Sequence, residues 1–202
     1  MKAIVSRPTR DILSFFMSVN WVYEHQQNIS CAAVKTYRYR LYPSAEQQRK
    51  LNEQLELCRD LYNSFLEQMI LAHKIGKDFN YNYQQNQIPE LKNTFRESKQ
   101  IHSQVLQDVA RRVDRAYQNF FRRVRENKNE KKQKAGFPKF RPRQRYRSRT
   151  IPQSGFHIME NGHLKLSKIG ELRMFQHRSI CGEIRALITA KEASGKGMHH
   201  SQ

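Results

Sequence analysis

The sequence predicts an α+β protein with long helices in its first two thirds and most of its strands near its end. Two stretches repeat apolar residues every three or four positions, which is typical of helices packed on a core. Residues 34–42 and several segments after residue 150 alternate instead with a period near two, as strands do. A length of 202 residues suits one domain or two small ones.

The charge of the chain restricts its class of partner. There are 37 Lys and Arg residues against 18 Asp and Glu residues, which gives a formal net charge of +19. This excess favours a polyanion, and nucleic acid more than a membrane surface. Three widely spaced cysteines predict no disulfide framework, and the apolar runs are too short to span a bilayer. We therefore expect a cytoplasmic protein that contacts no membrane.

The first strand is expected at residues 34–43. Residues 35–42 alternate basic and aromatic side chains, and Pro43 ends the pattern. Residues 1–33 have little charge and no clean period, so we interpret them as a leader of doubtful relevance, which an over-extended start would explain.

A helical lobe is predicted for residues 44–127. Ser44 and Gln47 fit a capping box, and Gly76 is a natural residue to end the first helix. Residues 79–87 show little period and predict a loop, with a short helix starting at Pro89. A second long helix starts near Ser103, and its arginines make one side positive. The apolar face of the first helix is expected to contain Leu51, Leu55, Cys58, Tyr62, Phe65 and Met69.

Residues 128–149 have the composition of a linker that binds nucleic acid. Residues 131–149 contain no acidic side chain, and Phe137, Phe140 and Tyr146 are interleaved with the cations. Pro138 and Pro142 exclude a continuous helix. Cations bind phosphates and aromatic rings stack on bases, so this mixture indicates nucleic-acid binding. A solvated basic linker is the alternative.

Strands are predicted again over residues 150–196. Asn161-Gly162 lies between two short strand-like segments and indicates a two-residue hairpin turn. Segments 171–175 and 183–189 supply two further strands, and nothing strand-like follows the turn at 194–196. We interpret residues 197–202 as an aberrant tail, and we expect an unpaired sheet edge after Thr189.

Several segments, in order, resemble TnpB, the OrfB-type protein of insertion sequences and a family of RNA-guided DNA nucleases. They are KTYRYRLYPS (35–44), HSQVLQD (102–108), GFPKF (136–140), LSKIG (166–170) and GEIR (182–185) with SGK (194–196). The resemblance covers about residues 34–196, with Ser167 where the family often has Pro. It implies a small, wedge-like β-barrel of N-terminal and C-terminal strands, with an inserted helical recognition lobe of the helix-turn-helix type. The barrel is expected to be incomplete.

The same resemblance implies guide-type RNA and DNA as partners. It places their contacts on the first strand and on the basic run, and the positive side of the second long helix adds two arginines. The predicted nucleic-acid-binding residues are Lys35, Arg38, Arg40, Arg112, Arg115, Lys139, Phe140, Arg141, Arg143, Arg145, Arg147 and Arg149.

No catalytic residue, metal site or cofactor is predicted in this chain. The family's Mg²⁺-binding carboxylates and four-cysteine Zn²⁺ site lie C-terminal to the matched region. No Asp follows Asp114, and Asp108 and Asp114 do not share a helical face well. We interpret the chain as the non-catalytic N-terminal part of a TnpB-like protein, truncated before its RuvC-like nuclease domain, with a separately encoded C-terminal half as a candidate partner. The alternatives are a stand-alone helix-turn-helix regulator of its insertion sequence and a non-functional pseudogene product.

Overall fold

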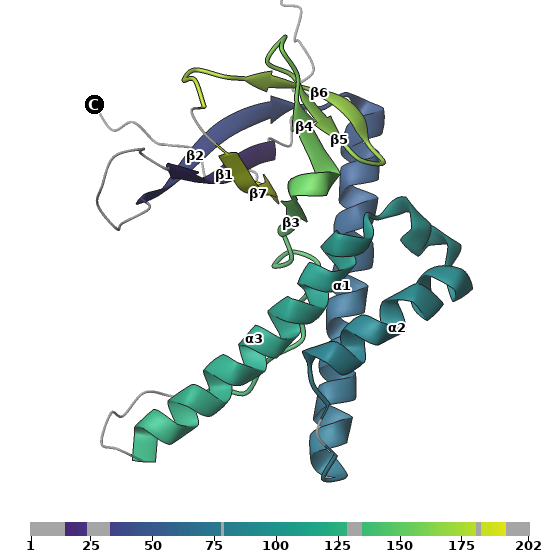
Figure 1. The fold of residues 1–202 in the computed structure, drawn as a ribbon. Helices are drawn as coiled ribbons and strands as arrows, with labels where there is room; N and C mark the ends of the chain where they lie inside the picture. The colour runs from purple at the N-terminus through teal and green to yellow at the C-terminus, as the bar shows by residue number, and fades with distance from the viewer. Residues whose placement is uncertain (1–14, 24–32, 78, 129–134, 181–182, 193–202) are drawn as a thin grey trace, which may run out of the picture.

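The structure is a computed structural model that describes residues 15–23, 33–77, 79–128, 135–180 and 183–192. A seven-stranded sheet lies at one end, and helices α1 and α3 diverge as they run away from it (Figure 1). The α+β class predicted from the sequence is confirmed. The helices are α1 (Ala45–Lys74), α2 (Tyr81–Thr94) and α3 (Ser103–Lys128), with 3-10 turns η1 (Arg96–Gln100) and η2 (Gln153–Gly155). The strands are β1 (Phe15–Tyr23), β2 (Ala33–Tyr42), β3 (Ser148–Pro152), β4 (Phe156–Ile158), β5 (Leu164–Leu166), β6 (Gly170–Phe175) and β7 (Glu183–Lys191).

The sheet is open and antiparallel, with strand order β3-β7-β1-β2-β6-β5-β4. Strands from the two ends of the chain therefore share one open sheet, as the resemblance to TnpB implies for an incomplete barrel. The expected unpaired edge after Thr189 is wrong. Thr189 on β7 pairs with Met17 of β1 on one side and with Arg149 of β3 on the other. Among the described strands, β3 and β4 form the edges.

The interpretation of residues 1–33 as a leader is wrong for the residues of strand β1 (Phe15–Tyr23), which belong to the sheet. Val19 pairs with Tyr37 of β2 and with Leu187 of β7, so β1 lies inside the sheet. The signal in the sequence is an alternation in which Ser18 and Asn20 separate apolar residues. The other residues before β2 lie outside the described part of the chain.

Helix α1 begins and ends as its sequence predicts. The Ser44 hydroxyl accepts a hydrogen bond from the Gln47 N–H, and the Gln47 side chain accepts one from the Ser44 N–H, so the capping box is complete. After the helix, Gly76 has a φ of 67°, and the Lys77 N–H donates to the Ala72 carbonyl at 2.9 Å. This is a Schellman motif, and glycine suits the left-handed conformation that it requires.

Helix α2 replaces the loop expected at residues 79–87. The Asn80 side chain accepts a hydrogen bond from the Tyr83 N–H and so caps the helix before Pro89, which lies inside it. The buried Gln84 donates to the Phe65 carbonyl at 2.7 Å, and Ile88 is also buried. The bond from Gln84 to α1 and the burial of Ile88 in the core stabilise a helix that its polar, weakly periodic sequence does not indicate.

One hydrophobic core joins the helices to the sheet. The predicted apolar face of α1 is confirmed, because Leu51, Leu55, Cys58, Tyr62 and Phe65 are buried and Met69 packs partly buried against them. Side chains from α3 and from β2, β3, β5, β6 and β7 complete the same cluster, among them Leu106, Val109, Val113, Tyr39, Leu41, Ile151, Leu166, Leu172 and Leu187. The sheet therefore fixes the positions of α1 and α3.

The hairpin predicted around Asn161-Gly162 is present, with a longer turn than expected. Ile158 of β4 pairs with Leu164 of β5, and the Met159 N–H donates to the His163 carbonyl at 2.8 Å. Three residues remain in the turn, and Gly162 has a φ of 76°. A three-residue hairpin turn commonly places glycine in this left-handed conformation. Within the described residues, no helix has both the length and the apolar character needed to cross a membrane.

The buried thiol of Cys58 predicts a pH dependence of stability. Burial raises the pKa of Cys58 from its ordinary value of 9.0 to about 11. A pKa raised in the folded state contributes stability that is fully present below pH 9 and is lost as the pH rises through 11. We expect up to about 3 kcal/mol of the free energy of unfolding to be lost in this range, as measured by urea unfolding at each pH.

The C58A variant is the control for this prediction. It retains the other cysteines, so any thiol titration of theirs is common to both proteins. Its free energy of unfolding should fall less steeply between pH 9 and 10 than that of the unmodified chain, whatever the absolute cost of the cavity. Equal slopes for the two proteins would contradict the role given to Cys58.

Candidate nucleic-acid interface

Residues 135–147 return from the far end of α3 toward β3, and α1 holds them in place (Figure 1). The Asn63 side chain on α1 accepts a hydrogen bond from the Arg141 N–H at 2.8 Å and donates one to the Arg141 carbonyl at 3.1 Å. On the α3 side, the Phe137 ring packs edge-on against the rings of Tyr117 and Phe120, with centroids 5.4 and 5.1 Å away. The segment is therefore fixed against both helices at defined points.

A cavity of about 620 Å³ lies between this segment and α3; we call it the basic hollow. Seven Lys and Arg residues line it, and no Asp or Glu is among its described lining residues. Such a concave surface concentrates a positive potential. The lining residues are Tyr62, Arg112, Arg115, Ala116, Asn119, Arg123, Gly136, Phe137, Pro138, Lys139, Phe140, Arg141, Arg145, Tyr146, Arg147 and Ser148.

The basic hollow brings together seven of the twelve predicted site residues. They come from two segments that are well separated in the sequence, α3 and the basic run. Spacings of three and four residues place Arg112, Arg115, Asn119 and Arg123 along one side of α3. Arg123 and Tyr62 are not among the predicted residues. For Arg123, the signal available was its helical spacing from Arg112. The predicted residues that line the hollow are Arg112, Arg115, Lys139, Phe140, Arg141, Arg145 and Arg147.

Four cations of the hollow are available to a ligand. The side chains of Arg115, Arg123, Lys139 and Arg145 make no hydrogen bond or ion pair within the described part of the chain. The Arg123 Nε is buried and lacks a partner among those residues. An unpaired buried donor is costly, so an anion that accepted its hydrogen bond would stabilise this arrangement.

Arg112 has a structural role. Its Nε donates to Asp108 at 2.7 Å, and its other two nitrogens donate to the Ser148 carbonyl at 2.7 Å and to the Thr150 hydroxyl at 2.9 Å. These bonds join α3 to β3. Because all three nitrogens are engaged, Arg112 can add positive potential to the hollow, but it has less capacity than its neighbours to form new bonds.

Other cations of the basic run are held by the protein. The Arg143 side chain pairs with Glu56 of α1, and the Arg147 Nε donates to the Gln144 carbonyl. The Arg141 guanidinium lies 5.9 Å from the centre of the Tyr62 ring, close enough for a cation–π contact. Arg143 does not line the basic hollow.

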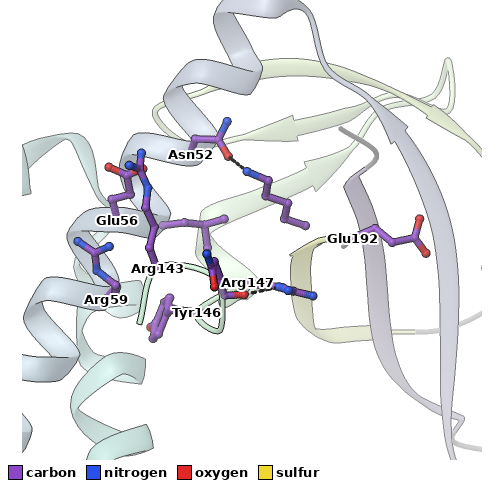
Figure 2. Close-up of a pocket in the computed structure, with 10 residues that line it drawn as sticks. Asn52, Glu56, Arg59, Arg143, Tyr146, Arg147 and Glu192 are labelled. Atoms are coloured by element: carbon purple, nitrogen blue, oxygen red, sulfur yellow. Dashed lines mark hydrogen bonds and ion pairs between the residues drawn. The ribbon is translucent and has the colours of Figure 1, made fainter. Parts of the chain in front are cut away.

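Arg143 lines a smaller neighbouring cavity of about 210 Å³ between α1, residues 143–147 and the end of β7 (Figure 2). Glu56 and Glu192 are among the residues that line this cavity, together with its cations. Lys191 donates to the Asn52 side chain at 3.1 Å. The mixed charge makes this cavity a weaker candidate for a polyanion than the basic hollow.

Arg149 lies in the core, away from any surface that a phosphate could reach. Its side chain is 3% exposed, its Nη1 donates to Gln54 of α1, and its Nε donates to the Thr189 hydroxyl of β7 at 3.2 Å. Burial lowers the pKa of Arg149 to about 10. The strand period places Arg149 on the same face as the buried Ile151. We therefore leave Arg149 out of the candidate interface.

The three predicted residues on β2 lie apart from the basic hollow. Arg38 and Arg40 are exposed, Arg38 pairs with Glu192 at 3.4 Å, and the Arg40 guanidinium lies 5.4 Å from the Tyr42 ring centre. Lys35 pairs with Trp21 in the β1–β2 ladder. None of the three is among the lining residues of the hollow.

The part of the chain that the structure describes contains no cluster of side chains that could bind a metal ion. No group of three or more His, Cys, Asp or Glu side chains is close enough there to hold an ion. The described residues thus do not fit the Mg²⁺ and Zn²⁺ sites of the TnpB family, and no hydrolytic step is assigned to them.

Comparison with known proteins confirms the resemblance to TnpB. Residues 34–78 match a family described as a helix-turn-helix domain, of the OrfB type (HTH_OrfB_IS605). In the structure, the matched residues form β2 and α1 with the turn that follows. A transposon-associated protein that binds nucleic acid is therefore supported.

A longer similarity is found to InsQ of Escherichia coli (strain K12), whose name marks it as a candidate RNA-guided DNA endonuclease. The two sequences are 26% identical over 166 residues, which is 81% of this chain. The aligned region covers 39% of the relative's own length.

The position of Arg149 predicts a structural effect of its removal. The R149A variant should lose about 2–4 kcal/mol of the free energy of unfolding, because the side chain leaves a cavity and Gln54 and Thr189 lose their partner. Urea unfolding at neutral pH measures this loss. R145A removes the same charge from an exposed position and should change stability by no more than about 0.5 kcal/mol. A similar, small effect of both substitutions would contradict the structural role of Arg149.

Proposed function

We propose that this chain is the nucleic-acid-binding, non-catalytic part of a TnpB-like protein, and that the basic hollow is its main contact surface. The observation that carries the proposal is the convergence of seven cations and two phenylalanines on one cavity without a carboxylate among its described lining residues. Phosphates are the chemical group that such a set of side chains binds best. The available cations Arg115, Arg123, Lys139 and Arg145 would supply the direct contacts.

The similarity to InsQ supports guide-type RNA and target DNA as the nucleic acids. On this proposal the chain binds them and does not cleave them, since its described residues offer no set of metal ligands. A second polypeptide that carries a RuvC-like domain is a candidate partner. Lys35, Arg38 and Arg40 remain proposed as a separate contact on β2, away from the hollow.

A stand-alone DNA-binding regulator is the second candidate, and the helix-turn-helix match over residues 34–78 favours it. Such a regulator places a helix in the major groove and reads base edges. It would bind a short duplex from the ends of its own element tightly even in excess bulk RNA. Loss of that binding on RNA competition favours the first proposal.

The proposed contact surface predicts the salt dependence of binding. Replacing Arg115, Lys139 and Arg145 by Gln should reduce the slope of log K against log salt concentration by about 2–3 units, because each phosphate contact contributes about 0.7–0.9. Fluorescence anisotropy with a labelled RNA and a labelled DNA over a salt series measures the slope.

The matched control replaces Lys74, Lys77 and Arg96 by Gln. These residues are exposed and lie outside the hollow, and their replacement removes the same total charge. The slope should change less in this control than in the hollow variant. Equal slopes in the two variants would show that net charge, rather than the hollow, determines binding.

A further inference from the structure

We infer that the basic hollow takes an unpaired nucleic-acid strand, with one base stacked on Phe140 and the adjoining phosphates held by Arg115, Arg123, Lys139 and Arg145. This inference rests on the proposed function and specifies the form of nucleic acid that the site binds. Its first support is the environment of Phe140, which is 53% exposed although it lines a cavity. Among the described residues its ring packs on no other aromatic ring and lies under no cation.

The contrast with Phe137 shows that the two rings of the GFPKF segment have different roles. Phe137 is fixed edge-on against Tyr117 and Phe120, so it attaches the segment to α3. Phe140 follows three residues later and is left with an open face. The backbone between and after them is restricted by Pro138 and Pro142, and Asn63 holds Arg141 next to Phe140. The ring is thus presented from a defined backbone, as a stacking platform requires.

The arrangement of charge favours a strand over a point anion. Arg115 and Arg123 are eight residues apart on α3, which corresponds to about 12 Å along the helix axis. Lys139 and Arg145 lie on the opposite wall, which the returning segment forms. Four cations spread along α3 and over both walls match the successive phosphates of a backbone better than they match a single phosphate.

The shape of the site disfavours a duplex. In a duplex the bases are stacked on one another, and their faces are not available to a phenyl ring. A cavity of about 620 Å³ has the size of a small-ligand site and can admit an unstacked base. Sequence-tolerant binding of single strands uses this combination of a positively charged groove and aromatic rings.

The test compares F140A with F95A, since Phe95 at the end of α2 is similarly exposed and lies outside the hollow. The probes are labelled oligo(U), labelled oligo(dT) and an oligo(dA)·oligo(dT) duplex, and the measured quantity is Kd by anisotropy at fixed salt. We expect F140A to weaken binding of at least one single strand by about 5- to 150-fold, the range for loss of one base–aromatic stack. F95A should leave Kd unchanged, and F140W should restore it.

The duplex should bind F140A as well as it binds the unmodified chain. An effect on oligo(U) alone or on oligo(dT) alone supports the site and identifies its strand as RNA or DNA. Equal Kd values of F140A and F95A for both single strands overturn the inference, as does tighter binding of the duplex than of either single strand. If none of the three probes binds, the proposed function itself fails.

Discussion

The attachment of the basic run to the sheet by two arginines is the constraint on which the candidate site depends. Arg112 joins α3 to the start of β3 through Ser148 and Thr150, and Arg149 joins β3 to Gln54 of α1. These bonds fix the position of β3, and with it the point at which the basic run enters the core. Because Asn63 and Phe137 hold the preceding residues, the run forms one wall of a cavity rather than a free linker. The candidate surface therefore depends on Arg149, which does not line the hollow, and on Arg112, which lines it with all three side-chain nitrogens already engaged.

Neighbouring arginines in the same run have opposite physical roles, and burial separates them. Arg145 is exposed and unpaired within the described residues, whereas Arg149 is buried and bonded. Burial without a carboxylate partner is costly for a guanidinium, which is reflected in the lowered pKa of Arg149. The bonds from Arg149 to Gln54 and Thr189 offset part of this cost and join β3 to α1 and β7. The composition of the run gives no reason to separate Arg145 from Arg149. The period-two pattern of β3 does, because it places Arg149 on the buried face together with Ile151.

Local signals with a direct mechanism were sufficient to predict much of the fold. The capping box at Ser44, the left-handed Gly76 and the apolar face of α1 were all predicted, because each depends on residues close in sequence. Helix α2 and strand β1 were not, since their stability comes from partners outside the segment itself: Gln84 of α2 bonds to Phe65 of α1, and β1 pairs with the distant β7. The sequence likewise shows the basic and aromatic residues of the candidate site, but it does not show that they line a cavity. Concavity arises only when α3 and the returning segment face each other.

The clustering of charge is itself an argument about function. Like charges that line one cavity repel one another, and more so where water is partly excluded, so their proximity opposes folding. Here seven cations share one cavity, and Asp108, which pairs with Arg112, is not among the residues that line it. An occupant with regularly spaced negative charges would relieve this repulsion and stabilise the folded state by mass action. This relief of repulsion is the physical reason why we propose a nucleic-acid strand as the occupant of the hollow.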